Sequence, residues 1–296
     1  MAAKVEASKA AQRRVSISGM LKYLGVSRTG YRAFLRHKPT ATQKRRAAMK
    51  DKIQQIYDDS KQNYGAPKIA KTLQHQGEII SERTVGKYMH QMGIRAQWVK
   101  HWIATTKDSG FSNQLHNILD EQFNPDRPNA VWCTDITYLW TVNDEFVYLT
   151  SVMDLYSRKI IAWTLTRSME VSCVVDTINK AKARRNTDKP LVLHSDRGSQ
   201  YVSQAYRNAA AKFQLSYSHK GYPYDNACIE SFHSLIKREW TNRFRIRDYF
   251  HAYSLVFEYI ETFYNTVRIH SHCDYMSLDQ FERMYEEVQE KPALAS

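Results

Sequence analysis

The chain has 296 residues, enough for two or three ordinary domains with a sizeable core, so a wholly disordered protein is excluded. Hydrophobic residues make up 43% and charged residues 25%, as in most globular proteins, but the formal net charge is +13. Residues 1–100 carry 21 basic and 6 acidic side chains, whereas residues 101–296 carry 22 and 24. This asymmetry favours a polyanion-binding module joined to another domain, with a solvated basic surface as the alternative.

Membrane, secretion and disulfide signals are missing from the sequence. No apolar run approaches the roughly 18–20 residues that a membrane span needs, and the first residues lack the apolar stretch of a signal peptide. The four cysteines stand singly without a CxxC pair, which argues against a disulfide framework or a cysteine zinc site. We therefore expect a cytoplasmic protein with reduced thiols.

The basic segment 1–42 contains a first helix-turn-helix-like pattern, ISGMLKYLGVSRTGYRAFLR. Gly25 stands at a turn, and Ser27 is placed to cap the second helix at its N-terminus. Arg28 and Arg32 follow in that helix and are candidate DNA contacts.

Residues 43–100 contain a second pattern of the same kind. A helix over 47–59 is followed by YGAPKIAKTLQHQ and by ISERTVGKYMHQMGI, where Ser81 can cap a third helix. One face of this third helix carries the polar side chains expected of a recognition helix in a major groove, namely Arg83, Thr84, Lys87 and His90. Three-helix units also serve as plain interaction modules, but the local positive charge favours DNA.

A linker at 101–126 ends in turn-forming residues. After it, the spacing of hydrophobic residues changes from a helical pattern to a strand pattern. The runs VWCTDITYLW, EFVYLTSVMDL and RKIIAWTL predict an antiparallel three-strand meander. A helix at 171–185, a strand LVLHSD, a helix at 204–213, a strand LSYS and a long helix from near 227 follow. Strands with interleaved helices imply an α/β domain whose mixed sheet is covered on both faces.

Three acids occupy positions in these elements that can converge at one edge of the sheet. Asp135 lies in mid-strand, Asp196 ends a strand, and Glu230 lies in the first turn of the last long helix, which Asp225 or Asn226 can cap. Glu230 alone is equally well explained as a first-turn stabiliser. Together, three unpaired carboxylates would repel one another unless a cation were bound, and oxygen ligands favour Mg²⁺ or Mn²⁺.

Two further features lie beyond Glu230. Lys237 follows on nearly the same helical face, about 10 Å along the axis, where it can meet a phosphate. Towards the C-terminus, a stripe at spacings of three and four is expected to pack in the core, and it comprises Phe250, Tyr253, Phe257, Ile260 and Tyr264.

The motifs WCTDITYL, HSDRGSQY and YDNACIESFHSLIKRE together resemble the catalytic core of retroviral integrases and of DDE transposases. Over residues 16–281 the chain resembles most the second-reading-frame transposase protein of the insertion-sequence-3 family. The resemblance implies small all-α helix-turn-helix domains at 1–42 and 43–100 and, after the linker, a ribonuclease-H-like mixed-sheet core at 127–240. A C-terminal helical extension and tail occupies 241–296.

The resemblance also implies a function and its residues. Asp135, Asp196 and Glu230 match the three catalytic, metal-binding acids, and Lys237 matches the basic residue that follows. The implied activity is binding of insertion-sequence ends, metal-dependent strand cleavage and 3′-hydroxyl strand transfer, with two ions per active site when DNA is bound. The implied partners are double-stranded terminal-repeat and target DNA, further copies of the chain on paired ends, and an upstream-frame transposase protein whose need stays open. The 33 residues between Asp196 and Glu230 are slightly fewer than in the family's commonest form.

Other functions remain as alternatives. A ribonuclease H or junction nuclease has the same core but hydrolyses without strand transfer, so joined products distinguish the two. A DNA-binding regulator with relic acids would neither cleave DNA nor gain thermal stability from Mg²⁺. Glycoside hydrolysis also uses paired carboxylates, but it gives no reason for a basic N-terminal half.

Overall fold

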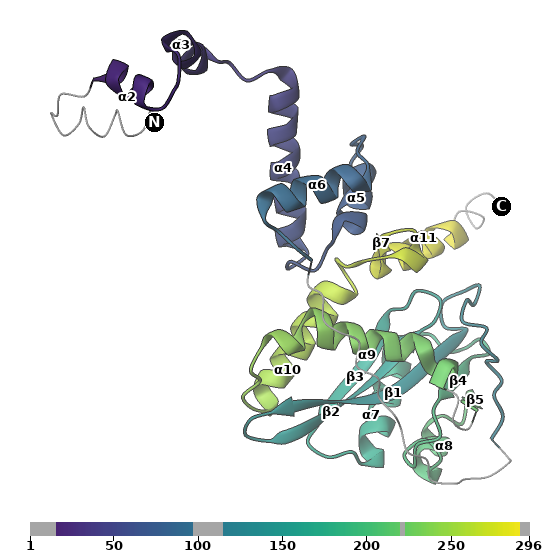
Figure 1. Ribbon diagram of the computed structural model, residues 1–296. Helices are drawn as coiled ribbons and strands as arrows, with labels where there is room; N and C mark the ends of the chain where they lie inside the picture. Colours follow the sequence, from purple (N-terminus) through teal and green to yellow (C-terminus); the bar gives the residue numbers. More distant parts are fainter. Residues whose placement is uncertain (1–15, 97–114, 220–222, 291–296) are drawn as a thin grey trace. The chain divides into compact units, whose positions relative to one another are not determined.

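The computed structural model describes residues 16–96, 115–219 and 223–290 (Figure 1). The chain divides into two compact units, residues 1–52 and 53–296, and the division falls within helix α4 (Ala41–Asp59). Residues 97–114, which include the end of the expected second domain and the first part of the expected linker at 101–126, lie outside the described residues, as do parts of the expected N-terminal segment and C-terminal tail. Across the described ranges, no helix combines the length and apolar character that crossing a membrane requires.

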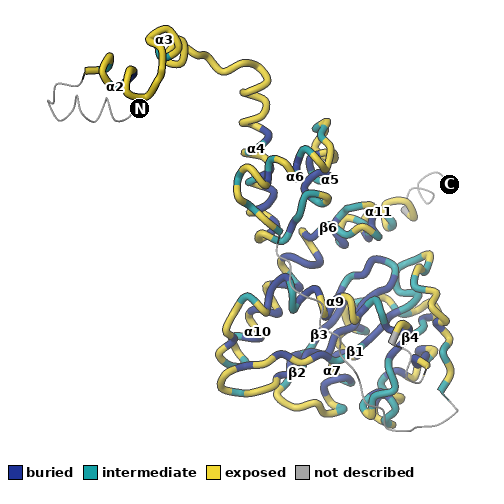
Figure 2. The backbone as a smooth tube through the Cα atoms, in the orientation of Figure 1, coloured by how far each residue is buried: buried dark blue, intermediate teal, exposed yellow. Residues whose placement is uncertain are grey.

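The first unit begins with two short helices, α2 (Ile17–Tyr23) and α3 (Arg28–Arg36). The Ser27 hydroxyl accepts a hydrogen bond from the Gly30 amide at 3.0 Å, so the N-cap expected from the sequence is confirmed. Gly25 takes a left-handed backbone conformation at the turn between the helices. Leu21 is buried in α2 whereas α3 buries no residue and is coloured almost entirely as exposed in Figure 2. This helix pair therefore has almost no core of its own.

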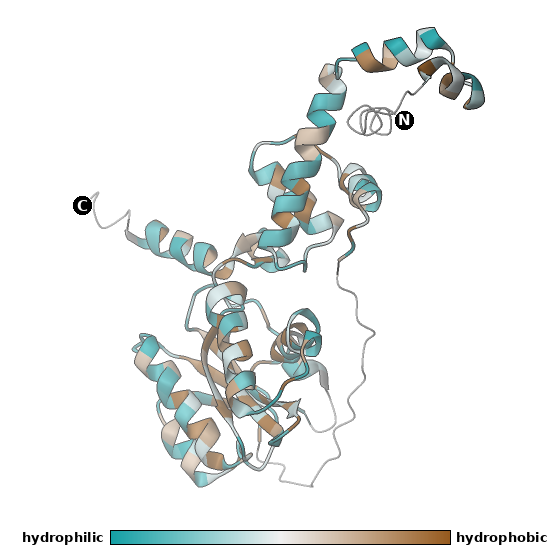
Figure 3. Cartoon of the chain, turned by 90° about the vertical axis from the view of Figure 1, so that its left-hand side faces the viewer, coloured by the Kyte–Doolittle hydropathy of each residue, from teal (hydrophilic) through white to brown (hydrophobic). Residues whose placement is uncertain are grey.

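Helix α4 starts at Ala41, six residues before the start expected from the sequence. The cause is a capping box, because the Thr40 hydroxyl accepts from the Gln43 amide at 3.2 Å and the Gln43 side chain accepts from the Thr40 amide at 2.9 Å. The first turns of α4 are basic and exposed, and they appear hydrophilic in Figure 3. Sequence periodicity missed this start because these turns have no buried face.

The second half of α4 belongs to a small helical core with α5 (Ala66–His75) and α6 (Glu82–Met92). The Ser81 hydroxyl caps α6 as expected, by accepting from the Thr84 amide. The side chains buried here come from all three helices and include Ile53, Ile69, Leu73, Val85 and Met89. The outer side of α6 is thereby left to polar residues.

A five-stranded mixed sheet with strand order β3-β2-β1-β4-β5 forms the centre of the second unit. The predicted antiparallel meander is present as β1 (Val131–Thr141), β2 (Glu145–Asp154) and β3 (Ile160–Thr166). Strand β4 (Val192–Ser195) runs parallel to β1, and β5 (Gln214–Tyr217) runs parallel to β4. The mixed α/β class expected from the sequence is confirmed.

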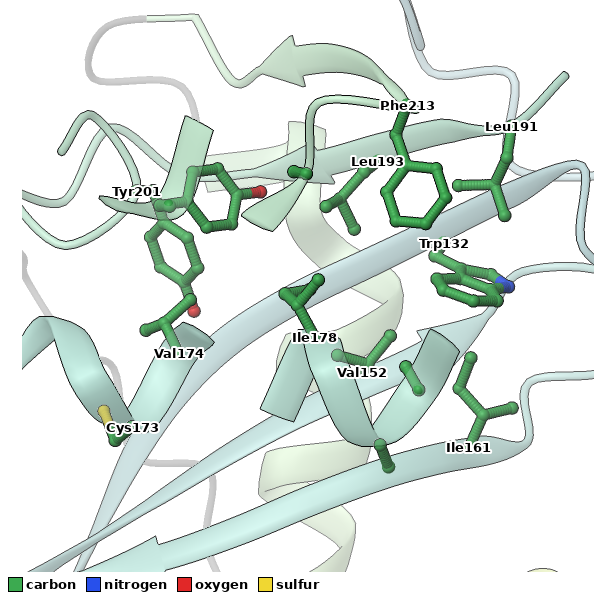
Figure 4. Close-up of a cluster of buried hydrophobic side chains, with 14 of the residues drawn as sticks. Trp132, Val152, Ile161, Cys173, Val174, Ile178, Leu191, Leu193, Tyr201 and Phe213 are labelled. Carbon is green, nitrogen blue, oxygen red and sulfur yellow. The ribbon is translucent and has the colours of Figure 1, made fainter. Parts of the chain in front are cut away.

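Helices cover both faces of this sheet. On one face lie α7 (Val171–Arg184) and α8 (Gln204–Ala209), which ends four residues before the predicted 204–213. Figure 4 shows the core beneath them, where Trp132, Val152, Ile178 and Leu193 pack together, each with almost no solvent exposure. The opposite face is covered by α9 (Ala227–Glu239) and α10 (Tyr249–Phe257).

The C-terminal extension is not purely helical. Helix α10 continues into a π-helical segment, η3 (Glu258–Tyr264), and a short antiparallel pair, β6 (Ile269–His270) and β7 (Met276–Ser277), precedes α11 (Leu278–Glu290). This extension also contains two short 3₁₀ turns, η2 (Thr241–Arg243) and η4 (Ser271–Cys273), and a third, η1 (Pro223–Asn226), precedes α9.

The expected buried aromatic stripe of the extension is only partly correct. Ile260 and Tyr264 are buried, but Phe250, Tyr253 and Phe257 are 71%, 44% and 47% exposed. A π-helical segment has more residues per turn than an α-helix, because its hydrogen bonds reach five residues back. Residues spaced three and four apart therefore change face where α10 passes into η3.

Candidate active site

Asp135 and Asp196 lie where two parallel strands separate. Strand β4 pairs with β1 only over residues 131–134, with Thr134 opposite Ser195. Asp135 is the next residue of β1, and Asp196 is the first residue after β4. In a parallel register the two acids are therefore the next neighbours, at the carboxyl end of β4, where α/β sheets commonly carry functional groups.

Glu230 enters from the first turn of α9, as the sequence predicted. Asn226 occupies the N-cap position of α9, but the expected side-chain cap is wrong, because no side-chain hydrogen bond caps this helix. The Asn226 amide instead donates to the Thr134 carbonyl at 3.4 Å, and the Asp225 carboxylate accepts from the backbone and ring of His219. The start of α9 is thus tied to β1 beside Asp135, which places Glu230 near the other two acids.

The three carboxylates interact electrostatically. Burial, and then repulsion from Asp135, raises the pKa of Asp196 to about 6. Burial, and then repulsion from Asp135 and Asp196, likewise raises the pKa of Glu230 to about 6. Negative charge is therefore concentrated at this edge of the sheet, where a cation would relieve it.

The donor atoms suit a hard divalent cation, since all of them are carboxylate oxygens. In the described ranges, however, no three His, Cys, Asp or Glu side chains are arranged so as to hold a metal ion as they stand. The chemistry and charge of these donors fit Mg²⁺ or Mn²⁺.

Gly198 provides the space that the Asp196 carboxylate occupies. The Gly198 amide donates to Asp196 Oδ1 at 2.9 Å. A Cβ atom at Gly198 would stand 3.0 Å from that same oxygen and 3.3 Å from Gln200 Oε1. The turn after β4 therefore holds Asp196 in a position that a larger residue would disturb.

His233 is a site residue to which the sequence analysis gave no role. It lies one helical turn after Glu230, with its Nδ1 3.3 Å from Asp135 Oδ2 and its Nε2 3.5 Å from the Ser151 hydroxyl. Its side chain is 7% exposed. The available signal was its spacing of three from Glu230, which places both side chains on one face of α9. His233 holds the Asp135 carboxylate from the covered side of the sheet.

Lys237 lies at the rim of this site. Its ammonium group is 4.6 Å from the centre of the Tyr138 ring, in a cation–π contact. Burial lowers the pKa of Lys237, and the Asp135 carboxylate opposes that shift. The Lys237 side chain is thus held beside the acids.

The other expected DNA contacts lie on two separate helices. On α6, Arg83, Lys87 and His90 are exposed, whereas Thr84 is half-buried and its hydroxyl lies 2.9 Å from that of Ser81. On α3, the Arg28 guanidinium donates to the Ser18 hydroxyl and Arg32 is exposed. Thr84 is occupied in the cap of its helix, which makes it the weakest of these candidates.

Comparison with known families agrees with this arrangement. The family model described as "Integrase core domain" matches residues 125–223, a second model with the same description matches 211–277, and an "HTH-like domain" model matches 43–102. An integrase core that follows a helix-turn-helix-like module defines a DNA-recombining protein.

Curated relatives identify the family. The chain is 35% identical over 251 residues to the transposase for insertion sequence element IS904 of Lactococcus lactis, covering 84% of this chain and 99% of the relative. It is 34% identical over 283 residues to transposase InsF for insertion sequence IS3A of Escherichia coli, covering 92% and 95%. The chain therefore belongs to the insertion-sequence-3 family of transposases, and its integrase core acts in DNA transposition and integration.

Two solved structures are more distantly similar. The simian T-cell lymphotropic virus intasome in complex with a PP2A regulatory subunit matches at 14% identity and a TM-score of 0.43, covering 77% of this chain and 73% of that one. The HTLV-2 integrase catalytic core domain in complex with magnesium matches at 15% identity and a TM-score of 0.40, covering 53% and 98%.

Proposed function

We propose that this protein binds insertion-sequence ends, cleaves one strand there in a metal-dependent step and transfers the resulting 3′ hydroxyl to a new phosphodiester. The observation that carries the proposal is the placement of Asp135 and Asp196 side by side where β1 and β4 separate, with Glu230 in the first turn of α9. Burial, and then repulsion among these acids, raises the pKa of Asp196 and of Glu230 to about 6. Such an arrangement is unfavourable in an isolated protein. It becomes useful when cations and a phosphate are bound between the acids.

The three acids would hold Mg²⁺ or Mn²⁺, two ions when DNA is bound. When bound, the ions supply charge stabilisation for the attacking and leaving oxygens of the phosphodiester. Phosphoryl transfer depends on positioning and charge more than on a protein nucleophile, so a site without a reactive Ser or Cys is sufficient.

The chain's remaining residues position the substrate and the acids. His233 orients the Asp135 carboxylate from the covered face of the sheet, and Lys237 binds a phosphate beside the scissile bond. The exposed basic residues of α3 and α6 bind the DNA duplex. Copies of the chain assemble on paired insertion-sequence ends. This proposal takes its DNA contacts from the chain itself, so it can be tested without an upstream-frame protein.

The test is strand cleavage and joining with purified protein, Mg²⁺, duplexes carrying the inverted repeats that flank its gene, and a supercoiled acceptor. The variants Asp135→Asn, Asp196→Asn and Glu230→Gln should abolish both products while duplex binding is retained. Asp188→Asn, a change at an exposed acid outside the site, should behave as wild type.

Three results would count against the proposal. Activity that survives all three substitutions would reject the proposed site. Products that are nicked but never joined would favour a nuclease. Absence of cleavage, together with no thermal stabilisation by Mg²⁺, would favour a DNA-binding regulator.

A further inference from the structure

An exposed cluster of three aromatic rings lies next to the candidate active site. Tyr138 and Trp140 of β1 and Phe146 of β2, here called the aromatic wall, are 53%, 56% and 42% exposed. Phe146 makes edge-to-face contacts with both of the others, with ring centres 5.2 Å from Tyr138 and 4.9 Å from Trp140. Large rings on a sheet are usually covered, so this patch calls for a function.

The strands that carry the aromatic wall are held in place by backbone hydrogen bonds. Trp140 and Phe146 face each other directly across the β1–β2 ladder. The turn between these strands is fixed in addition by backbone bonds from Val142 to Ile246 at 3.0 Å and from Asn143 to Arg247 at 2.8 Å. Rings held this way can receive a ligand at little cost in conformational entropy.

Helix α7 covers the sheet face that carries the wall, but only at some distance from the β1–β2 turn. Helix α7 packs over Thr150 and Thr164, whose hydroxyls lie 3.4 Å from the Cys173 sulfur and 2.9 Å from the Thr177 hydroxyl. Beyond them, towards the β1–β2 turn, the three rings are left exposed within the described part of the chain. In Figure 2 the tube of this turn changes from buried to exposed colouring.

Positive charge borders the wall. The Lys237 ammonium lies over the Tyr138 ring, and Arg245 and Arg247 are exposed beside the β1–β2 turn. Three acids lie there as well: Glu145, Asp144, which pairs with Arg167, and Asp248, which caps α10. Aromatic rings with adjacent cations are typical of surfaces that bind single-stranded nucleic acid by base stacking. A twofold interface between copies would use the same patch twice and bring these cations together, so the charge favours DNA over a second copy.

The wall is also at a suitable distance from the acids. Along β1, at about 3.4 Å per residue, Tyr138 is about 10 Å and Trp140 about 17 Å from Asp135. These distances correspond to about three and five nucleotides of a stacked strand at 3.4 Å each. Side chains alternate along β1, so the Asp135 carboxylate lies on the α9 face and the two rings on the α7 face. Beyond Thr134 this side of β1 is no longer paired with β4, and there Lys237 of α9 reaches the Tyr138 ring. A strand whose phosphate lies at the acids can follow the same edge, which brings its unpaired bases onto the rings.

We propose that the aromatic wall binds unpaired bases of the DNA strand that leaves the catalytic carboxylates, by stacking them on Tyr138 and Trp140. This inference rests on the proposed function, because it takes the acids as the position of the scissile phosphate. It adds a binding subsite for single-stranded DNA and a reason for the exposed rings.

The test compares binding of two DNA probes to the full-length protein in metal-free buffer, where no cleavage takes place. One probe is a blunt duplex, and the other is the same duplex with a five-nucleotide single-stranded 3′ tail that carries 2-aminopurine. We expect tighter binding of the tailed probe and quenched 2-aminopurine fluorescence. Trp140→Ala should weaken tailed binding about 5- to 150-fold, the range for losing one stacked base, and leave blunt binding unchanged.

Two further variants and one measurement make the result decisive. Trp140→Phe should restore most of the preference for the tail, and Phe250→Ala, which removes an exposed ring on α10, should leave it unchanged. Equal tail preference in wild type and Trp140→Ala would overturn the proposal. So would a wild-type dimer in sedimentation equilibrium that Trp140→Ala turns into a monomer without loss of tail preference.

The proposed function and the wall can fail separately. Asp135→Asn should keep the tail preference, because stacking needs no carboxylate. A protein that prefers the tail through Trp140 but never cleaves DNA would refute the proposed function alone. A protein that cleaves and joins DNA but shows no tail preference would refute the wall alone.

Discussion

The buried ion pair at the end of α9 provides a sharp test of how the site is held. Arg268 donates from Nε and from a terminal guanidinium nitrogen to the two oxygens of Glu239, each at 2.7 Å, and the Tyr259 hydroxyl donates to the same carboxylate at 2.8 Å. Burial alone would raise the pKa of Glu239, but Arg268 holds it below its ordinary value. Glu239 is the last residue of the helix that carries Glu230.

Removing one partner leaves the other charge buried. Glu239 and Arg268 are 8% and 5% exposed, so Arg268→Met should lower the free energy of unfolding by about 3–5 kcal/mol. The double variant Glu239→Leu/Arg268→Met removes both charges and leaves the Tyr259 hydroxyl without its acceptor, at a cost of about 1–3 kcal/mol. The nearby Lys68 ammonium loses the attraction of Glu239 and the repulsion of Arg268 together. The double variant should therefore be more stable than the single one.

The assay is urea unfolding followed by circular dichroism, for the wild type, the two single variants and the double variant. A coupling free energy of about 2 kcal/mol or more is expected from the cycle. If Arg268→Met cost less than about 1 kcal/mol, or if the two single effects simply added, the ion pair would not be what secures the end of α9.

Three other predictions concern the site and the DNA contacts. His233→Leu should slow cleavage about 10- to 100-fold, whereas His233→Asn keeps a nitrogen near the Nδ1 position and should retain most activity in single-turnover assays; equal losses would exclude positioning of Asp135. The folded-state pKa of Asp196, about 6, exceeds its ordinary 3.8, so protonation stabilises the metal-free fold at low pH and this contribution is lost between about pH 4 and pH 6. The melting temperature should fall across that window, and an undiminished fall in Asp196→Asn would contradict the assignment. Joint replacement of Arg83 and Lys87 by Ala should reduce the slope of log affinity against log salt by about 2, if each contacts one phosphate, and an unchanged slope in binding titrations would show that they do not.

Much of the catalytic half could be predicted from local patterns. The alternation of side chains along a strand predicted which face of the sheet carries Asp135. The end of a strand followed by an Arg-Gly turn predicted the position of Asp196. These features depend on a few neighbouring residues, so one sequence is enough to find them.

Contacts between distant segments could not be predicted in this way. Asn226 stands at the N-cap position of α9, yet its side-chain amide donates to the Thr134 carbonyl of β1 and does not cap the helix. The role of His233 depends on which face of α9 meets the sheet. The exposed Phe250 and Phe257 were misjudged because a π-helical segment cannot be distinguished from an α-helix by the spacing of apolar residues.

The attachment of α9 to β1 has a consequence for how such chains diverge. Glu230 is placed by the contact of Asn226 with Thr134 and by the packing of α9 on β1, and not by the length of chain that connects it to Asp196. Insertions or deletions between β5 and α9 can therefore accumulate while the third acid keeps its place. Counting residues between the acids is consequently a poor guide to whether a copy of the element can still move.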